Sequence, residues 1–232
     1  MIICNTNNFV VIRPPKTGST SLVYYFFKSG LVKEQDIYAI DGPFSTWESF
    51  EAHNKKYGED YTYAPQLVKK ANEIKNVHIT FSELVEKNRV LKTMPCVATI
   101  RHPLERFSSS FYFVRNQCGG QFDGTPCVNP NAFWDALKNK EPRMGVKVLS
   151  KPQCDYFPDH AELFNTENLH EHVSKYILER GGKVDGRIEM RKNPDNKLDV
   201  FLAELTPDRK QDILDTYAKD FELWEKAYAV YN

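Results

Sequence analysis

The chain has 232 residues, of which 41% are hydrophobic and 27% are charged. Its 31 basic and 31 acidic side chains balance, which argues against a protein that coats nucleic acid, because such proteins are usually basic overall. Residues 1–15 lack the basic leader and the long apolar segment that are typical of a signal peptide, and no apolar run approaches the roughly 18 to 20 residues that a membrane-spanning helix needs. We therefore expect one soluble, cytoplasmic α/β domain over residues 1–232, with no membrane segment.

The five cysteines are scattered along the chain at Cys4, Cys96, Cys118, Cys127 and Cys154. None belongs to a CxxC pair or to a cysteine and histidine spacing that is typical of zinc sites. Cys118 and Cys127 would be able to form a disulfide in an oxidising compartment, whereas reduced thiols are expected in the cytosol.

The amino-terminal region predicts a strand, a tight loop and a helix. Residues 9–13 ("FVVIR") form a β-branched run that Pro14 and Pro15 end. Apolar residues then recur at helical spacing, and Gly30 follows as a stop. They are Leu22, Val23, Phe26 and Phe27.

The middle of the chain predicts a second unit of the same kind. Residues 64–75 have a helical pattern, residues 76–81 and 96–101 resemble strands, and Pro103 begins a helix. The apolar stripe of that helix leaves Ser109 on a different face. The stripe consists of Leu104, Phe107, Phe111 and Val114.

The carboxy-terminal half continues the alternation of strands and helices. Residues 117–131 are expected to be irregular, residues 162–169 to run from a strand into a helix over 169–180, and residues 181–197 to form a basic loop. Thr206 and Pro207 are typical of the N-cap and first position of a closing helix. Strands that alternate with helices predict a parallel β-sheet flanked by helices on both faces.

The stretch "RPPKTGSTSL" (13–22) has the features of an anion site. A strand–loop–helix turn presents unpaired amide groups and the positive end of the helix dipole, and Lys16 adds a full charge. The motif differs from the triphosphate loop GxxxxGK[ST], because its lysine comes two residues before the glycine. No acidic metal ligand ends the strand over 96–101. The loop is therefore expected to bind phosphate without a metal.

The stretch "TIRHPLERFSSSFYF" (99–113) repeats this architecture. Arg101 ends the strand, and Ser109 lies two turns into the helix that follows. A guanidinium group and a hydroxyl group that converge in this way suit a second anion.

Together the two stretches resemble the sulfotransferases that use 3′-phosphoadenosine 5′-phosphosulfate (PAPS), most closely the heparan-sulfate 2-O-sulfotransferase branch of the glycan sulfotransferases. "PKTGSTS" is similar to the 5′-phosphosulfate loop of that family, and "IRHPLERFSSS" is similar to its 3′-phosphate element. The resemblance implies a P-loop-like sulfotransferase fold, PAPS as the co-substrate with adenosine 3′,5′-bisphosphate as its product, and no metal.

The resemblance also assigns roles to individual residues. Lys16 would act at the leaving oxygen, while Arg101 and Ser109 would hold the 3′-phosphate. Arg191 and Lys192 resemble a late basic loop that closes on the nucleotide, although a solvated charged loop has the same composition. The 5′-phosphosulfate loop would comprise Pro15, Lys16, Thr17, Gly18, Ser19, Thr20 and Ser21.

A hydroxyl acceptor needs a base, and histidine has the most suitable unperturbed pKa. Among the six histidines, His78 in "VHITF" resembles the strand-end histidine that deprotonates the acceptor in this branch. The alternative is a structural histidine near the end of a strand, whose ring is hydrogen-bonded within the protein and takes no part in chemistry.

The acceptor is expected to be a hydroxyl group on a glycan or small glycoside. Arg13 and His78 are the candidate acceptor-binding residues, and residues 117–160 add basic and aromatic side chains that suit a sugar. The aromatic ones are Phe133, Trp134, Tyr156 and Phe157. Two other functions remain open, namely an ATP-dependent nucleotide or small-molecule kinase and a non-catalytic glycan- or nucleotide-binding module.

Overall fold

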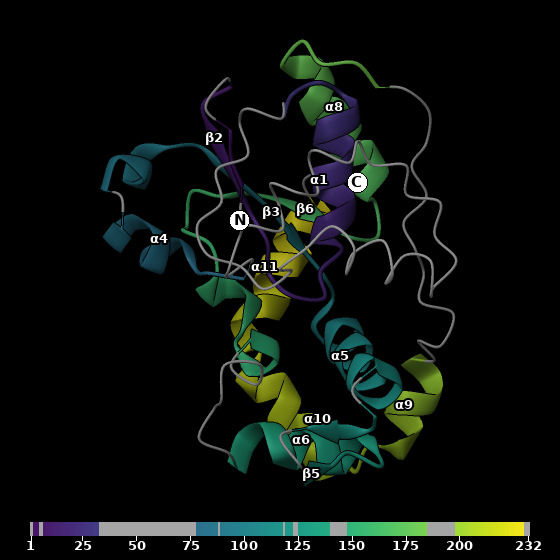
Figure 1. The fold of residues 1–232 in the computed structure, drawn as a ribbon. Coiled ribbons are helices and arrows are strands. Elements are labelled where there is room, and N and C mark those ends of the chain that lie inside the picture. The colour runs from purple at the N-terminus through teal and green to yellow at the C-terminus, as the bar shows by residue number, and fades with distance from the viewer. Residues whose placement is uncertain are drawn as a thin grey trace.

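The computed structural model describes residues 2–4, 7–32, 78–87, 89–117, 119–122, 125–139, 148–184 and 198–229. The strands in these ranges are β1 (Ile2–Cys4), β2 (Phe9–Ile12), β3 (Cys96–Ile100), β4 (Gln121–Phe122), β5 (Thr125–Pro126) and β6 (Glu162–Asn165). The α-helices are α1 (Ser19–Lys28), α4 (Phe81–Lys87), α5 (Pro103–Gln117), α6 (Pro130–Asn139), α8 (Leu169–Glu179), α9 (Leu198–Glu204), α10 (Pro207–Thr216) and α11 (Ala218–Ala229). Two short 3₁₀ helices are η2 (Arg89–Thr93) and η3 (Gln153–Asp155). Figure 1 shows their arrangement.

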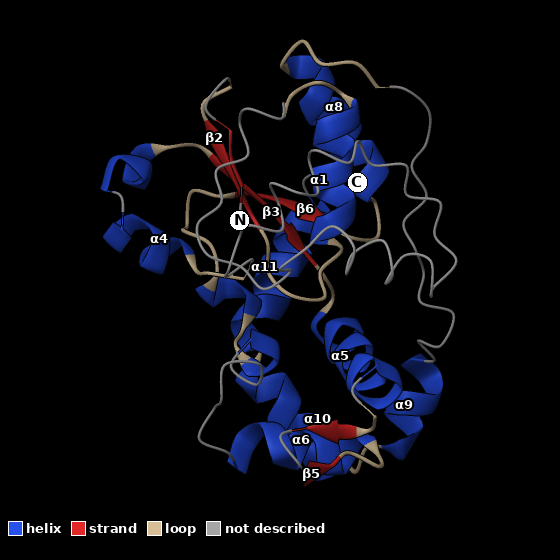
Figure 2. Cartoon of the chain, viewed as in Figure 1, coloured by secondary structure: helices blue, strands red, loops and turns tan. Residues whose placement is uncertain are grey.

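The main sheet has the strand order β1-β2-β3-β6, and its last three strands are parallel (Figure 2). The α/β class and the parallel core of the sheet are therefore as expected from the sequence. The sheet is not wholly parallel, because β1 pairs antiparallel with β2. The chain reverses before β2 at Asn8, whose φ of 53° lies in the left-handed region that asparagine tolerates.

Helices cover both faces of this sheet, as predicted. Side chains alternate between the faces along each strand, so Val11 and Val97 contact α1 and α8, whereas Val10 and Ala98 point to the opposite side. On that opposite side they pack with residues of α4, η2 and α11.

A third hydrophobic cluster joins α5, α6, α9 and α10 beyond the sheet, at the lower end of the molecule in Figure 1. The predicted stripe of α5 is confirmed, and it is buried in this cluster. The aromatic side chains that were expected to suit a sugar are instead core residues. The exposed fractions of Phe133, Trp134, Tyr156 and Phe157 are 0%, 1%, 1% and 9%.

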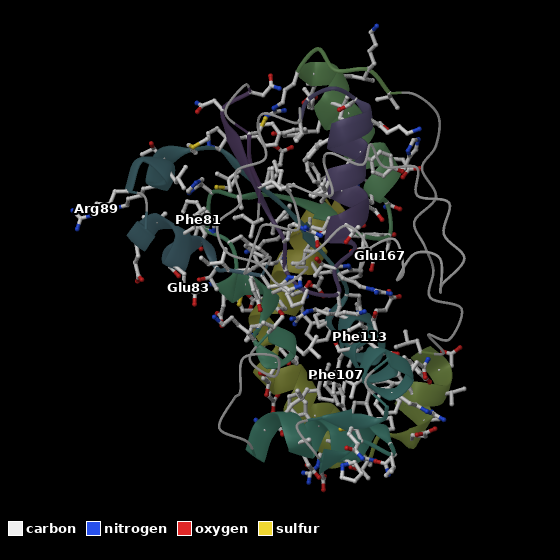
Figure 3. The ribbon with its side chains drawn as sticks, in the orientation of Figure 1. Phe81, Glu83, Arg89, Phe107, Phe113 and Glu167 are labelled. Atoms are coloured by element: carbon white, nitrogen blue, oxygen red, sulfur yellow. The ribbon has the colours of Figure 1, made fainter. Side chains whose placement is uncertain are left out.

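The predicted strand over residues 76–81 is wrong where the structure describes it. Residues 78–80 form a turn and a short irregular segment, and α4 begins at Phe81 (Figure 3). The Glu83 carboxylate accepts a hydrogen bond from the Thr80 amide at 2.8 Å, and the Glu83 amide donates to the Thr80 hydroxyl at 3.3 Å. This reciprocal capping box starts a helix where the alternating pattern predicted a strand.

Other boundaries also differ from the predictions. The closing helix begins at Pro207 with Thr206 as its N-cap, as expected, but it breaks at Tyr217 into α10 and α11. The irregular segment at 117–131 contains the short β4–β5 hairpin and the first residues of α6. The strand and helix predicted over 162–180 are confirmed as β6 and α8. The predicted helix at 64–75 lies outside the described residues.

Over the described ranges, no helix has both the length and the apolar character needed to cross a bilayer.

Candidate functional site

The loop between β2 and α1 turns sharply because two of its residues have left-handed backbone conformations. Lys16 has a φ of 63° and Gly18 has a φ of 72°. Glycine adopts this region freely, whereas for a residue such as lysine it costs roughly 1–2 kcal/mol. A strained residue of this kind points to a functional constraint, so Lys16 is the first candidate for chemistry in the loop.

Buried hydroxyl groups hold the loop against the sheet. The Thr17 side chain is fully buried, and its hydroxyl donates to the Pro14 carbonyl at 2.8 Å and lies 2.8 Å from the Thr99 hydroxyl. Ser19 donates to the same Pro14 carbonyl at 3.4 Å. The Thr166 hydroxyl donates to the Thr17 carbonyl at 3.3 Å. The hydroxyl groups of Thr17 and Ser19 therefore fix the shape of the loop from within.

The start of α1 forms the other side of the loop. Because α1 begins at Ser19, the first turn of the helix has few intrahelical acceptors for its amide groups. The Ser21 and Leu22 amides donate to the Gly18 carbonyl at 2.9 and 3.3 Å, which leaves those of Ser19 and Thr20. Thr20 is exposed and Ser21 is half-buried. The Thr20 hydroxyl accepts a hydrogen bond from Arg13 Nη2 at 3.2 Å. The amide groups of Ser19 and Thr20 and the helix dipole favour an anion at this point.

Arg101 brings the second predicted motif to the same place. It directly follows β3, which runs parallel to β2, so both loops leave the same edge of the sheet. Arg101 Nη1 lies 3.5 Å from the Lys16 carbonyl oxygen, and Nε donates to Glu105 Oε2 at 3.3 Å. The two anion-binding motifs predicted from the sequence are therefore neighbours in space.

Helix α5 adds a buried positive charge beneath the loop. Arg106 is 3% exposed, and it donates from Nε to the Pro15 carbonyl and from Nη2 to the Lys151 carbonyl, both at 3.0 Å. Among the described residues, no carboxylate lies within ion-pair distance of its guanidinium group. A buried charge is costly unless it is compensated, so this part of the site favours a bound anion.

Ser109 lies on the face of α5 that meets the loop. Arg106, three residues before Ser109, donates to the Pro15 carbonyl. The ring of Phe113, four residues after Ser109, contacts the Lys16 ammonium group, which lies 4.3 Å from the ring centroid. Residues at these spacings share one helix face. Figure 3 shows Phe113 on α5, and Glu167 beyond the end of β6. The structure therefore brings Lys16 and Arg101 together and places Ser109 on the face of α5 that meets the loop.

His78 lies beside the strand end that leads into the loop. Its Nδ1 is 2.8 Å from the Arg13 carbonyl oxygen, so in the neutral ring Nδ1 donates its proton and Nε2 is left as an acceptor. Burial is the main reason that the pKa of His78 falls to about 3. The hydrogen bond to Arg13 opposes this effect, while the positive charges of Arg13 and Arg106 add to it. His78 is therefore neutral at physiological pH. The same shift makes it a weak base, so a role in proton transfer requires its pKa to rise when the site is occupied.

His102, next to Arg101, belongs to the packing around α11. Its ring lies edge-on to Phe221 and Trp224, with centroid distances of 5.3 and 4.8 Å. Burial lowers its pKa as well. The Glu167 carboxylate accepts a hydrogen bond from Trp224 Nε1 at 3.1 Å and contacts the His102 amide at 3.4 Å. This histidine therefore serves the packing of the β3 end against α11.

Several sequence predictions lie outside the described residues. They include the late basic loop with Arg191 and Lys192, and also Cys118, one of the two cysteines for which reduced thiols were expected in the cytosol and a disulfide only in an oxidising compartment.

Three residues of this site were missed by the sequence analysis. Arg106 is detectable in principle, because it is an arginine within a helix whose neighbours are mostly apolar or small. Gln153 donates a hydrogen bond to the Arg101 carbonyl, and Asp220 accepts one from the backbone of Gln153. Both residues are far from Arg101 in the sequence, so no local pattern predicts these contacts.

Within the described ranges, no group of three or more histidine, cysteine, aspartate or glutamate side chains is arranged to hold a metal ion. Comparison of the chain with protein-family models, curated proteins and solved structures gave no match.

We expect the low pKa of His78 to make stability depend on pH. In the unfolded chain this histidine titrates near 6.5, whereas in the native state it stays neutral down to about pH 3. Below pH 6.5 only the unfolded state binds this proton, so stability should fall by up to about 1.4 kcal/mol per pH unit.

The measurement is urea unfolding of the wild type and of His78→Gln at several pH values. The difference between the two proteins should be constant above pH 6.5 and should change progressively as the pH falls below it. Parallel curves throughout would show that the pKa of His78 is not lowered in the native state.

Proposed function

We propose that the protein is a sulfotransferase that transfers a sulfuryl group from PAPS to a hydroxyl group on a carbohydrate acceptor. The observation that carries the proposal is the contact between Arg101 Nη1 and the Lys16 carbonyl at 3.5 Å. It joins two motifs that resemble the 5′-phosphosulfate loop and the 3′-phosphate element of glycan sulfotransferases. A nucleotide with phosphate groups at both ends of its ribose suits such a pair.

The charges around the loop fit an anionic nucleotide. Arg13, Lys16, Arg101 and Arg106 lie at one edge of the sheet, where Glu105 pairs with Arg101. Helix amide groups and positive side chains are the groups that bind phosphate in proteins. The buried Arg106 guanidinium makes a bound anion still more favourable here.

The residues support an in-line transfer. PAPS would supply the sulfuryl group, whose bond to the 5′-phosphate oxygen breaks as a bond to the acceptor oxygen forms. Lys16 would stabilise the negative charge that develops on the departing phosphate. Nε2 of the neutral His78 would accept the proton of the acceptor hydroxyl, and Nδ1 would remain bonded to the Arg13 carbonyl. The products are a sulfate ester, adenosine 3′,5′-bisphosphate and the proton held by His78.

Ligand-induced thermal stabilisation tests the proposal directly. A ligand at about 100 times its Kd adds roughly 2.7 kcal/mol to the stability of the native state, or roughly 5–10 °C in Tm for a chain of this size. Adenosine 3′,5′-bisphosphate should produce such a shift, and ATP with Mg²⁺ should not. The opposite result would favour a kinase and contradict the proposal.

A matched pair of variants locates the effect. Arg101→Ala should lose most of the shift with the bisphosphate, whereas Arg209→Ala should retain it. Both arginines pair with a carboxylate through Nε, but Arg209 contacts Asp135 at 2.8 Å, away from the loop.

Lys16→Ala should lower turnover by roughly 10²- to 10³-fold, which is the usual effect of removing one group that stabilises transition-state charge. The control is Lys138→Ala, because Lys138 also lies over an aromatic ring, at 5.3 Å from the Trp134 centroid. Transfer of labelled sulfate from PAPS is the measurement. Equal rates in the two variants would exclude the role of Lys16.

His78→Ala should lower kcat by roughly 10²-fold or more, with little change in the Kd of the bisphosphate, because the base acts on the acceptor. His160→Ala is the control, since the ring of His160 also lies near a backbone carbonyl, that of Met94, at 3.3 Å. Unchanged turnover in His78→Ala would remove this residue as the base.

A further inference from the structure

Arg101 is held by its backbone as well as by its side chain. The side chain of Gln153, in η3, forms two hydrogen bonds with the backbone of Arg101. Nε2 donates to the Arg101 carbonyl at 2.9 Å, and Oε1 accepts from the Arg101 amide at 3.0 Å. The ladder between β3 and β6 ends at Ile100, so Gln153 continues the pairing for the next residue of the chain.

Gln153 is held in turn by a carboxylate from the other end of the sequence. The carboxylate of Asp220, in α11, accepts hydrogen bonds from two backbone N–H groups, that of Gln153 at 2.7 Å and that of Cys154 at 2.8 Å. Gln153 and Asp220 are both 0% exposed. A chain of buried hydrogen bonds therefore runs from α11 through η3 to Arg101.

A chain of this kind is costly unless every member is satisfied. Burying an amide and a carboxylate is unfavourable without partners, whereas fully bonded networks make local geometry rigid. Apolar contacts from Tyr156 and Phe157 already pack the same segment against the sheet. The hydrogen bonds from Gln153 fix the backbone of Arg101, and Glu105 fixes its side chain by accepting a hydrogen bond from Nε.

We propose that Gln153 is a positioning residue that sets the selectivity of the site for the 3′-phosphate, with Asp220 holding it in place. This inference rests on the proposed function, in which Arg101 contacts the 3′-phosphate. A guanidinium group gives directional hydrogen bonds to phosphate only when its position is fixed, so loosening the Arg101 backbone should weaken that contact selectively. The contacts of the 5′-phosphate, which the loop and α1 provide, should remain.

The test compares two nucleotides by isothermal titration calorimetry. Adenosine 3′,5′-bisphosphate and adenosine 5′-monophosphate differ only in the 3′-phosphate, and the wild type should bind the bisphosphate at least about tenfold more tightly. Gln153→Met keeps the volume of the side chain and removes both hydrogen bonds. It should reduce this ratio by about tenfold and leave the Kd of the monophosphate within about twofold.

A control variant separates positioning from a general loss of structure. Tyr217→Phe removes a hydrogen bond to the carbonyl of Ser150, 2.9 Å long, in the segment just before η3. It does not touch Arg101, so it should preserve the ratio even if stability falls. Asp220→Asn should reduce the ratio in the same direction as Gln153→Met, and it replaces that variant in the comparison if Gln153→Met does not fold.

The possible outcomes are distinct. A wild type that binds the two nucleotides equally would contradict the proposed function and this inference with it. A wild type that discriminates, together with Gln153 and Asp220 variants that keep the full ratio, would overturn the inference alone. Equal loss of the ratio in Tyr217→Phe would also overturn it, because a general structural effect would then be sufficient.

Discussion

The parallel pairing of β2 with β3 is the constraint on which the candidate site depends. The register places Ile12 opposite Ala98, so both strands end at the same edge of the sheet and their following loops meet there. Ligands of open α/β sheets bind outside the carboxyl ends of such strands. The buried Thr17–Thr99 contact fastens the first loop to β3, and Arg101 then reaches the Lys16 carbonyl. An antiparallel pairing would have sent the two loops to opposite edges.

The site concentrates charge in a chain whose overall charge is zero. Arg106 is the clearest case, because it is buried and is held only by backbone carbonyls among the described residues. The same positive surroundings help to keep His78 neutral. A bound polyanion would balance the charge of the Arg106 guanidinium group. It would also raise the pKa of His78, and so favour the protonated form of the ring when a proton is transferred. Binding and proton transfer would in this way be coupled through one electrostatic field.

Local sequence patterns predicted the elements whose formation depends on residues close together in the sequence. The β2–α1 and β3–α5 units, the stripe of α5 and the Thr206–Pro207 start of α10 were all readable from the sequence. The strand expected at 76–81 was wrong because the capping box of Thr80 and Glu83 outweighed its alternating pattern. The partnership of Gln153 and Asp220 with Arg101 was not predictable, because residues 101, 153 and 220 meet only after three separate segments have packed.

The most direct test of a single site with two phosphate subsites is a crystal structure of the protein with adenosine 3′,5′-bisphosphate. We expect the 5′-phosphate within hydrogen-bond distance, about 2.7–3.2 Å, of the amide groups at the start of α1 and of Lys16. The 3′-phosphate should lie at the same distances from Arg101 and Ser109. A nucleotide bound elsewhere, or with its 3′-phosphate away from Arg101, would contradict the account.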